Sequence, residues 1–195
     1  MNFPTSLSDW PSHYDELRLL VRLEFGDDIS WSQNVKAPTD ADDFALECIY
    51  VILNSGMKWK VCQGIWQRLR PHIEEHGCVG ETFRHPGKRS AMDKIWERRT
   101  AYFTEFRAAA HKGDAAALEW CGTLPWIGPI TKYHLAKNFG VDCAKPDRHL
   151  VRAAEAAGTD THTLCKIISD QSGDRVATVD YVIWRACEMG ILTAN

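Results

Sequence analysis

The sequence predicts an all-α protein. Apolar side chains recur with helical spacing along most of the chain, and the alternating pattern of strands is sparse. The run from residue 44 to residue 53 is apolar nearly all round, which is typical of a helix buried at the centre of a fold. Capping residues such as Thr39 and Asp147 stand directly ahead of such periodic segments, where helices begin.

The expected helices succeed one another with short breaks. A first helix over residues 12–25 ends at Gly26, and the buried helix 44–53 ends at Asn54-Ser55-Gly56. The later elements are a helix through 61–69, a loop over 76–87, a long basic helix over about 90–110, a short helix from Asp114, the unit 123–139, and helices opening at Asp147, at Thr161 or Thr163, and at Asp174.

The distribution of charge along the chain and the spacing of the cysteines limit the functions that the sequence allows. The net charge is −3, yet the chain is polarised: residues 1–50 hold ten acids and three bases, whereas residues 84–112 hold eight bases and three acids. The seven cysteines are scattered without a C-x-x-C pair, which excludes the common zinc and iron–sulfur spacings. We see no signal peptide and no apolar run of 18 residues, so we expect a soluble, cytoplasmic protein.

The prediction of function depends mainly on one segment, Leu124-Pro125-Trp126-Ile127-Gly128-Pro129-Ile130-Thr131. It ends a short helix, turns tightly and starts another helix. Gly128 lets a partner approach the backbone closely, and unpaired N–H groups at the next helix start carry the positive end of its dipole. Such groups hold a DNA phosphate without reading sequence.

This segment, together with the next helix and the loop that leads to Asp147, resembles the helix-hairpin-helix (HhH-GPD) family of base-excision DNA glycosylases. The matching residues are Leu124, Pro125, Ile127, Gly128, Thr131, Phe139, Gly140, Pro146 and Asp147. The resemblance covers roughly residues 40–190. It implies a two-lobed helical fold with the active-site cleft between the lobes: one lobe over roughly 40–120, the hairpin and C-terminal helices over roughly 121–195, and the helix 12–25 packed against the latter.

The resemblance also implies roles for particular residues. Asp147 takes the position of the catalytic carboxylate, and the helix dipole favours its charged form. The implied contacts to the DNA backbone are Trp126, Gly128, Ile130, Thr131 and Arg148. In this family a wedge fills the gap that the extruded base leaves in the DNA. The residues implied for the wedge and for the base pocket are Asn54, Ser55, Met57, Lys58 and Trp59.

Two residues depart from the family pattern. Trp126 replaces the first glycine of the hairpin, at a turn where members of the family can hold a monovalent cation through backbone carbonyls. Ile130 stands where the strand-cutting members carry a lysine, and Lys132 lies about 200° further around the helix. We therefore expect a monofunctional enzyme that hydrolyses the N-glycosidic bond, with no zinc and no iron–sulfur cluster.

The expected partner is double-stranded DNA that contains a modified base, bound by a monomer away from membranes. Alkylated purines, oxidised guanine, deaminated bases and modified cytosines all remain open as substrates, in repair or in defence against phage. A non-catalytic helix-hairpin-helix module is the alternative; it needs the hairpin but not Asp147. A glycosylase/lyase that uses an unexpected lysine is a third hypothesis, which borohydride trapping would detect.

Overall fold

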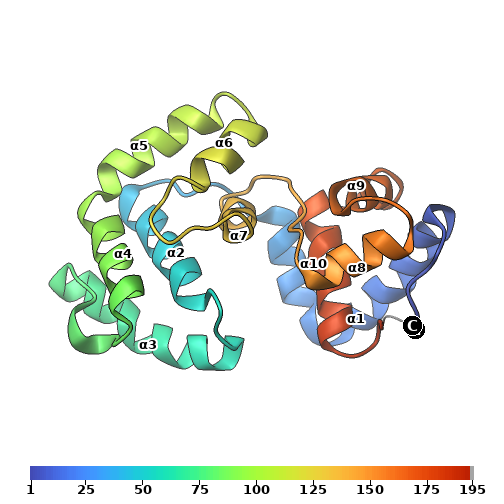
Figure 1. Ribbon diagram of the computed structural model, residues 1–195, viewed down its shortest axis with the longest axis horizontal. Helices are drawn as coiled ribbons and strands as arrows, with labels where there is room; N and C mark the ends of the chain where they lie inside the picture. Colours follow the sequence, from blue (N-terminus) through green and yellow to red (C-terminus); the bar gives the residue numbers. More distant parts are fainter. Residues whose placement is uncertain (194–195) are drawn as a thin grey trace. The chain divides into compact units, whose positions relative to one another are not determined.

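The prediction of an all-α fold is confirmed. The computed structural model describes residues 1–193, and within them the chain forms ten α-helices, two short 3₁₀ helices and no strand (Figure 1). The helices are α1 (Trp10–Asn34), α2 (Ala41–Asn54), α3 (Trp59–His76), α4 (Pro86–Glu97), α5 (Arg99–Ala110), α6 (Asp114–Cys121), α7 (Thr131–Asn138), α8 (Arg148–Ala156), α9 (Thr161–Ser172) and α10 (Val176–Glu188), with 3₁₀ turns η1 (Leu7–Asp9) and η2 (Gly80–Thr82). No helix in this range is both long and apolar enough to cross a membrane.

The chain divides into two compact units. Unit 1 combines Met1–Lys36 with the residues from Gly140 onward, and unit 2 is the continuous segment Ala37–Phe139. The sequence suggested a boundary near residue 121. The hairpin segment belongs with unit 2 instead, because α7 packs on both α6 and α2.

Helix α1 is the central element of unit 1, where it packs against α9 and α10. It does not end at Gly26 as expected. Phe25 has a non-helical backbone (φ −127°, ψ 31°), yet the helix resumes beyond this kink and continues to Asn34. Packing explains the continuation: Ile29 is buried, and the hydroxyl of Ser32 lies 3.2 Å from that of Thr178 on α10.

Asp174 has a different role from the helix cap that we expected. The N-cap of α10 is Arg175, whereas the buried Asp174 carboxylate accepts hydrogen bonds from the Tyr14 hydroxyl (2.6 Å) and the Arg18 Nε (2.5 Å). Burial, with the hydrogen bond to Asp174, raises the pKa of Tyr14. This network joins α1 to the start of α10 because a buried carboxylate needs partners for its charge.

The two ends of the described chain meet in unit 1. Asn2 and Thr193 form an isolated parallel bridge. The Phe3 N–H donates to the Thr193 carbonyl (3.2 Å), and the Thr193 N–H donates to the Met1 carbonyl (2.9 Å). These hydrogen bonds fix both segments against the same part of unit 1.

Unit 2 is built around α2, which is buried along most of its length as its apolar sequence predicts. Phe44 stacks on Phe139 with ring centroids 5.0 Å apart, and Phe106 and Trp120 pack beside them. The long basic helix expected over 90–110 is two helices, α4 and α5. They separate at Arg98, which has a non-helical backbone (φ −98°, ψ 12°).

The buried position of Glu47 on α2 predicts that the stability of the protein depends on pH. Burial raises the pKa of this carboxyl, although the Asn138 amide donates to it (2.5 Å) and the Arg70 charge opposes the shift. A raised pKa in the folded state gives stability that is fully present below the ordinary glutamate pKa and is lost as pH rises through the folded value.

We therefore expect Glu47→Gln to match the wild type in free energy of unfolding near pH 4 and to exceed it at pH 7. Glutamine keeps an oxygen for Asn138 and carries no charge. Urea denaturation at a series of pH values measures the difference. A difference between the two proteins that stays constant over this range would contradict the prediction.

Candidate functional site

The hairpin predicted from residues 124–131 forms in unit 2. Leu124 and Ile127 are buried beneath the turn, the Ile127 N–H donates to the Leu124 carbonyl (3.1 Å), and α7 begins at Thr131 as expected. Within residues 1–193, no hydrogen bond engages the backbone N–H groups of Gly128, Ile130 or Thr131. These donors precede a helix start, which is the arrangement that binds anions such as phosphate.

Trp126 has a left-handed backbone, a conformation that glycine adopts most readily. Its φ is +67°, and it is the one non-glycine residue with a positive φ in the described chain. A side chain in this left-handed region costs about 1–3 kcal/mol, and such cost persists where the surrounding structure holds the residue in place. The indole packs over Gly87 at the start of α4, with its ring 5.4 Å from that of His85.

This strain predicts an unusual order of stability between two variants. Trp126→Gly and Trp126→Ala both lose the indole, but only alanine keeps the cost of the left-handed backbone. We expect Trp126→Gly to be about 1 kcal/mol more stable to urea than Trp126→Ala. At an ordinary loop position alanine would be the more stable of the two by about 0.4–1 kcal/mol. That ordinary order here would rule out a left-handed backbone at residue 126.

Ile130, where the sequence resemblance placed the lysine of a lyase, is exposed. Ile130 is the N-cap of α7 and is 43% exposed. Lys132 is directed back to α6, where its Nζ donates to the Glu119 carboxylate (2.6 Å); this hydrogen bond is the main cause of its raised pKa. Its amine is therefore engaged with Glu119.

The turn after α2 contains the residues predicted for the wedge and base pocket. Ser55 and Met57 are half-buried, Gly56 turns the chain with φ +68°, and Lys58 and Trp59 are exposed at the start of α3. The Ser55 hydroxyl donates to the Ile52 carbonyl (2.8 Å), and the Met57 N–H donates to the Asn54 carbonyl (3.0 Å). The turn thus closes the end of α2 and projects a lysine and a tryptophan outward.

Lys88 supports this turn, a role that no pattern in the sequence indicates. It is 6% exposed, and its Nζ donates to the carbonyls of Leu53 (2.8 Å) and Ser55 (2.5 Å). Desolvation lowers the pKa of this amine. In the sequence Lys88 is one of the eight bases between residues 84 and 112, with nothing to set it apart from the others. In the structure its charge stabilises carbonyls at the C-terminal end of α2.

Asp147 lies in unit 1 as the N-cap of α8. Its Oδ1 accepts hydrogen bonds from the backbone N–H groups of His149 (2.9 Å) and Leu150 (3.1 Å). Among the hydrogen bonds and ion pairs of residues 1–193, none engages Oδ2. Two other aspartates, Asp40 and Asp160, cap helices with the same pair of bonds, but both are exposed whereas Asp147 is half-buried.

The surroundings of Asp147 are polar and carry charge. His149 Nε2 lies 3.0 Å from the Glu188 carboxylate on α10, and the exposed Arg148 lies 3.6 Å from the same group. Burial raises the pKa of the nearby Cys187 thiol to about 11, with further contributions from the charges of Asp147 and Glu188. Arg148 is therefore partly neutralised by Glu188. It belongs to unit 1, whereas Trp126, Gly128, Ile130 and Thr131 belong to unit 2.

The structure thus gathers the hairpin and wedge residues in unit 2, and Asp147 with Arg148 in unit 1. Chemically, the first group offers hydrogen-bond donors and exposed aromatic rings, and the second offers a carboxylate oxygen. No set of three or more His, Cys, Asp or Glu side chains within residues 1–193 is arranged to hold a metal ion. No protein-family model, curated protein or solved structure matches this chain.

Proposed function

We propose that the protein is a monofunctional DNA glycosylase of the two-lobed HhH-GPD fold. The observation that carries the proposal is the hairpin 124–131 followed by Asp147 at a helix start, half-buried and with one carboxylate oxygen left without a partner in the described residues. The hairpin supplies donors for a phosphate of duplex DNA. Asp147 supplies the negative charge that the reaction requires.

In the proposed reaction, water adds to C1′ of the deoxyribose as the bond between C1′ and the base nitrogen breaks. The base leaves with the bonding electrons and takes up a proton. Positive charge develops on the sugar in the transition state, and the Asp147 carboxylate stabilises it and accepts the proton of the water. The product is an intact strand with an abasic site.

Two observations support simple hydrolysis over strand cleavage. Ile130 takes the place of the family's lysine, and the amine of Lys132 is hydrogen-bonded to Glu119. A lyase needs a neutral amine to form an imine at C1′. Borohydride should therefore trap no covalent complex between protein and DNA; a trapped band would replace the proposal with a glycosylase/lyase.

The test is an assay for abasic sites on a panel of DNA substrates. The panel contains alkylated, oxidised and deaminated bases and phage DNA with glucosylated hydroxymethylcytosine, and an aldehyde-reactive probe reports the product. We expect aldehydes on one class of substrate, which would also separate repair from phage defence. Binding to DNA without aldehyde on any member of the panel would favour the non-catalytic helix-hairpin-helix module.

A further inference from the structure

The indole of Trp126 is an exposed ring with a fixed position. A Cβ atom at Gly87 would lie 2.6 Å from Cζ3 of the indole, so the ring fills the space that any other residue at 87 would need. His85 approaches the ring edge-on, with an angle of 77° between the planes. Even so, Trp126 is 45% exposed. One part of the ring is thus seated on α4 while a large part remains accessible.

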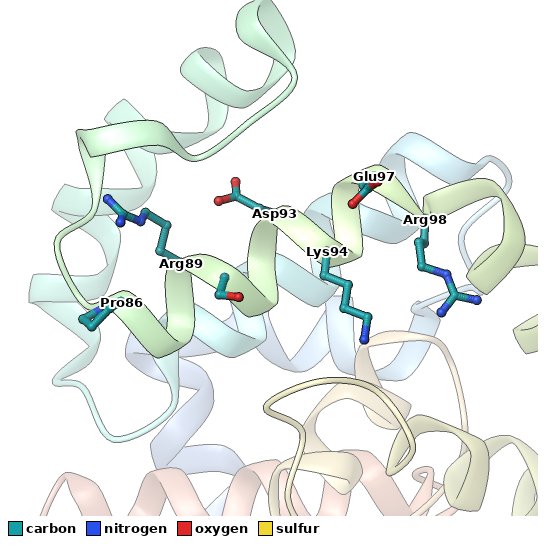
Figure 2. Close-up of a pocket in the computed structure, with 7 residues that line it drawn as sticks. Pro86, Arg89, Asp93, Lys94, Glu97 and Arg98 are labelled. Atoms are coloured by element: carbon teal, nitrogen blue, oxygen red, sulfur yellow. The ribbon is translucent and has the colours of Figure 1, made fainter.

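The groups around the ring suit a nucleotide strand. The unengaged N–H groups of Gly128, Ile130 and Thr131 come directly after Trp126 and are donors for a phosphate. An open groove of about 500 Å³ runs along α4 from Pro86, the neighbour of Gly87; it is lined by Pro86, Arg89, Ser90, Asp93, Lys94, Glu97 and Arg98 (Figure 2). Trp126 contacts Gly87, next to the end of this groove at Pro86. Aromatic rings combined with positively charged grooves are what proteins use to bind single strands.

The charges of the groove favour a polyanion. Gly87 and Lys94 lie seven residues apart, on the same face of α4. In Figure 2 the side chains of Lys94 and Arg98 extend to the same side of the helix. The carboxylate of Asp93 already accepts a hydrogen bond from the Val79 N–H (2.7 Å). The groove has three bases, Arg89, Lys94 and Arg98, and two acids, Asp93 and Glu97, so the bases exceed the acids by one.

We propose that Trp126 is a stacking platform for an unpaired nucleobase of the bound DNA, with the attached strand running along the groove of α4. Trp126 belongs to unit 2 and Asp147 to unit 1, and the proposal rests on DNA binding in the proposed function but not on catalysis. A stacked base contacts the exposed part of the indole, and the phosphates next to it meet the hairpin N–H groups and the cations of α4. The protein should therefore prefer DNA with a single-stranded overhang over blunt duplex.

The experiment compares the affinities for two DNA molecules, a blunt duplex and the same duplex with a short single-stranded overhang, at one fixed salt concentration. We expect the wild type to prefer the overhang. Trp126→Gly keeps the turn, because glycine tolerates the positive φ, and should reduce the overhang-to-blunt affinity ratio roughly 10-fold or more. Gly87→Ala, which displaces the indole without removing it, should reduce the ratio in the same direction. The control is Trp31→Leu, an exposed tryptophan of α1, which should leave the ratio unchanged.

The outcomes separate this proposal from the proposed function. An overhang-to-blunt ratio that is equal in the wild type and Trp126→Gly overturns the stacking platform, whatever the glycosylase assay shows. Abasic-site formation that fails while the ratio falls in Trp126→Gly overturns the glycosylase and supports the platform. A wild type that binds neither DNA overturns both.

Discussion

Asp147→Asn should abolish base release on any substrate that the wild type accepts, with a loss of at least about 100-fold in single-turnover rate. Asparagine caps helices about as well as aspartate, so the hydrogen bonds to the N–H groups of His149 and Leu150 should persist. The variant loses the negative charge on the oxygen that has no partner in the described residues. The measurement is the rate of abasic-site formation with enzyme in excess over DNA.

Asp160→Asn is the matched control for this experiment. Asp160 lies in the same unit, caps α9, and accepts hydrogen bonds from the N–H groups of His162 and Thr163, each at 3.0 Å. Its substitution makes the same chemical change at a helix start and should leave the rate of base release unaltered. DNA binding should survive in both variants. If Asp147→Asn were fully active, Asp147 would be a cap and nothing more, and the proposed chemistry would fail.

Lys88→Met should destabilise the protein by about 2 kcal/mol, which is a large effect for a lysine. The substitution keeps the apolar stem but removes the ammonium from the carbonyls of Leu53 and Ser55. Hydrogen bonds to charged groups contribute about 1.5–3 kcal/mol each, and the cost of burying the amine offsets part of this sum. Urea denaturation followed by circular dichroism measures the loss.

Lys94→Met provides the comparison on the same helix. Lys94 is exposed, so its removal should change the free energy of unfolding by less than about 0.5 kcal/mol. Equal stability of the two variants would mean that the ammonium of Lys88 does not hold the end of α2. A loss confined to Lys88→Met would assign that role to the amine, since both substitutions have the same chemistry.

Local signals in the sequence predicted the helices better than their ends. Asp147 stands at a helix start because a capping side chain and the apolar periodicity after it act within one turn. Gly26 carries an equally local signal, but α1 continues past it because Ile29 and Ser32 are buried in unit 1. Asp174 likewise does not cap a helix as expected, because its carboxylate is hydrogen-bonded to Tyr14 and Arg18, which are distant in sequence.

In the candidate site, too, features that depend on neighbouring residues are predictable from the sequence, and features that depend on distant residues are not. The hairpin and Asp147 are predictable because their residues adjoin one another or lie a short, characteristic distance apart. Lys88 is not predictable, because its buried position depends on carbonyls more than thirty residues away, and it stands among bases that are exposed or half-buried. Gly87 carries no signal either, since its need to be glycine arises only from the ring of Trp126.

The bridge between Asn2 and Thr193 makes the molecule suitable for circular permutation. Unit 1 is encoded in two separate stretches, with unit 2 inserted between Lys36 and Gly140. A short linker from residue 193 to residue 1 would join those stretches into one continuous polypeptide that reads from 140 through the linker to 36. Each unit could then be encoded as a single open reading frame: unit 1, which contains Asp147, and unit 2, which contains the hairpin 124–131.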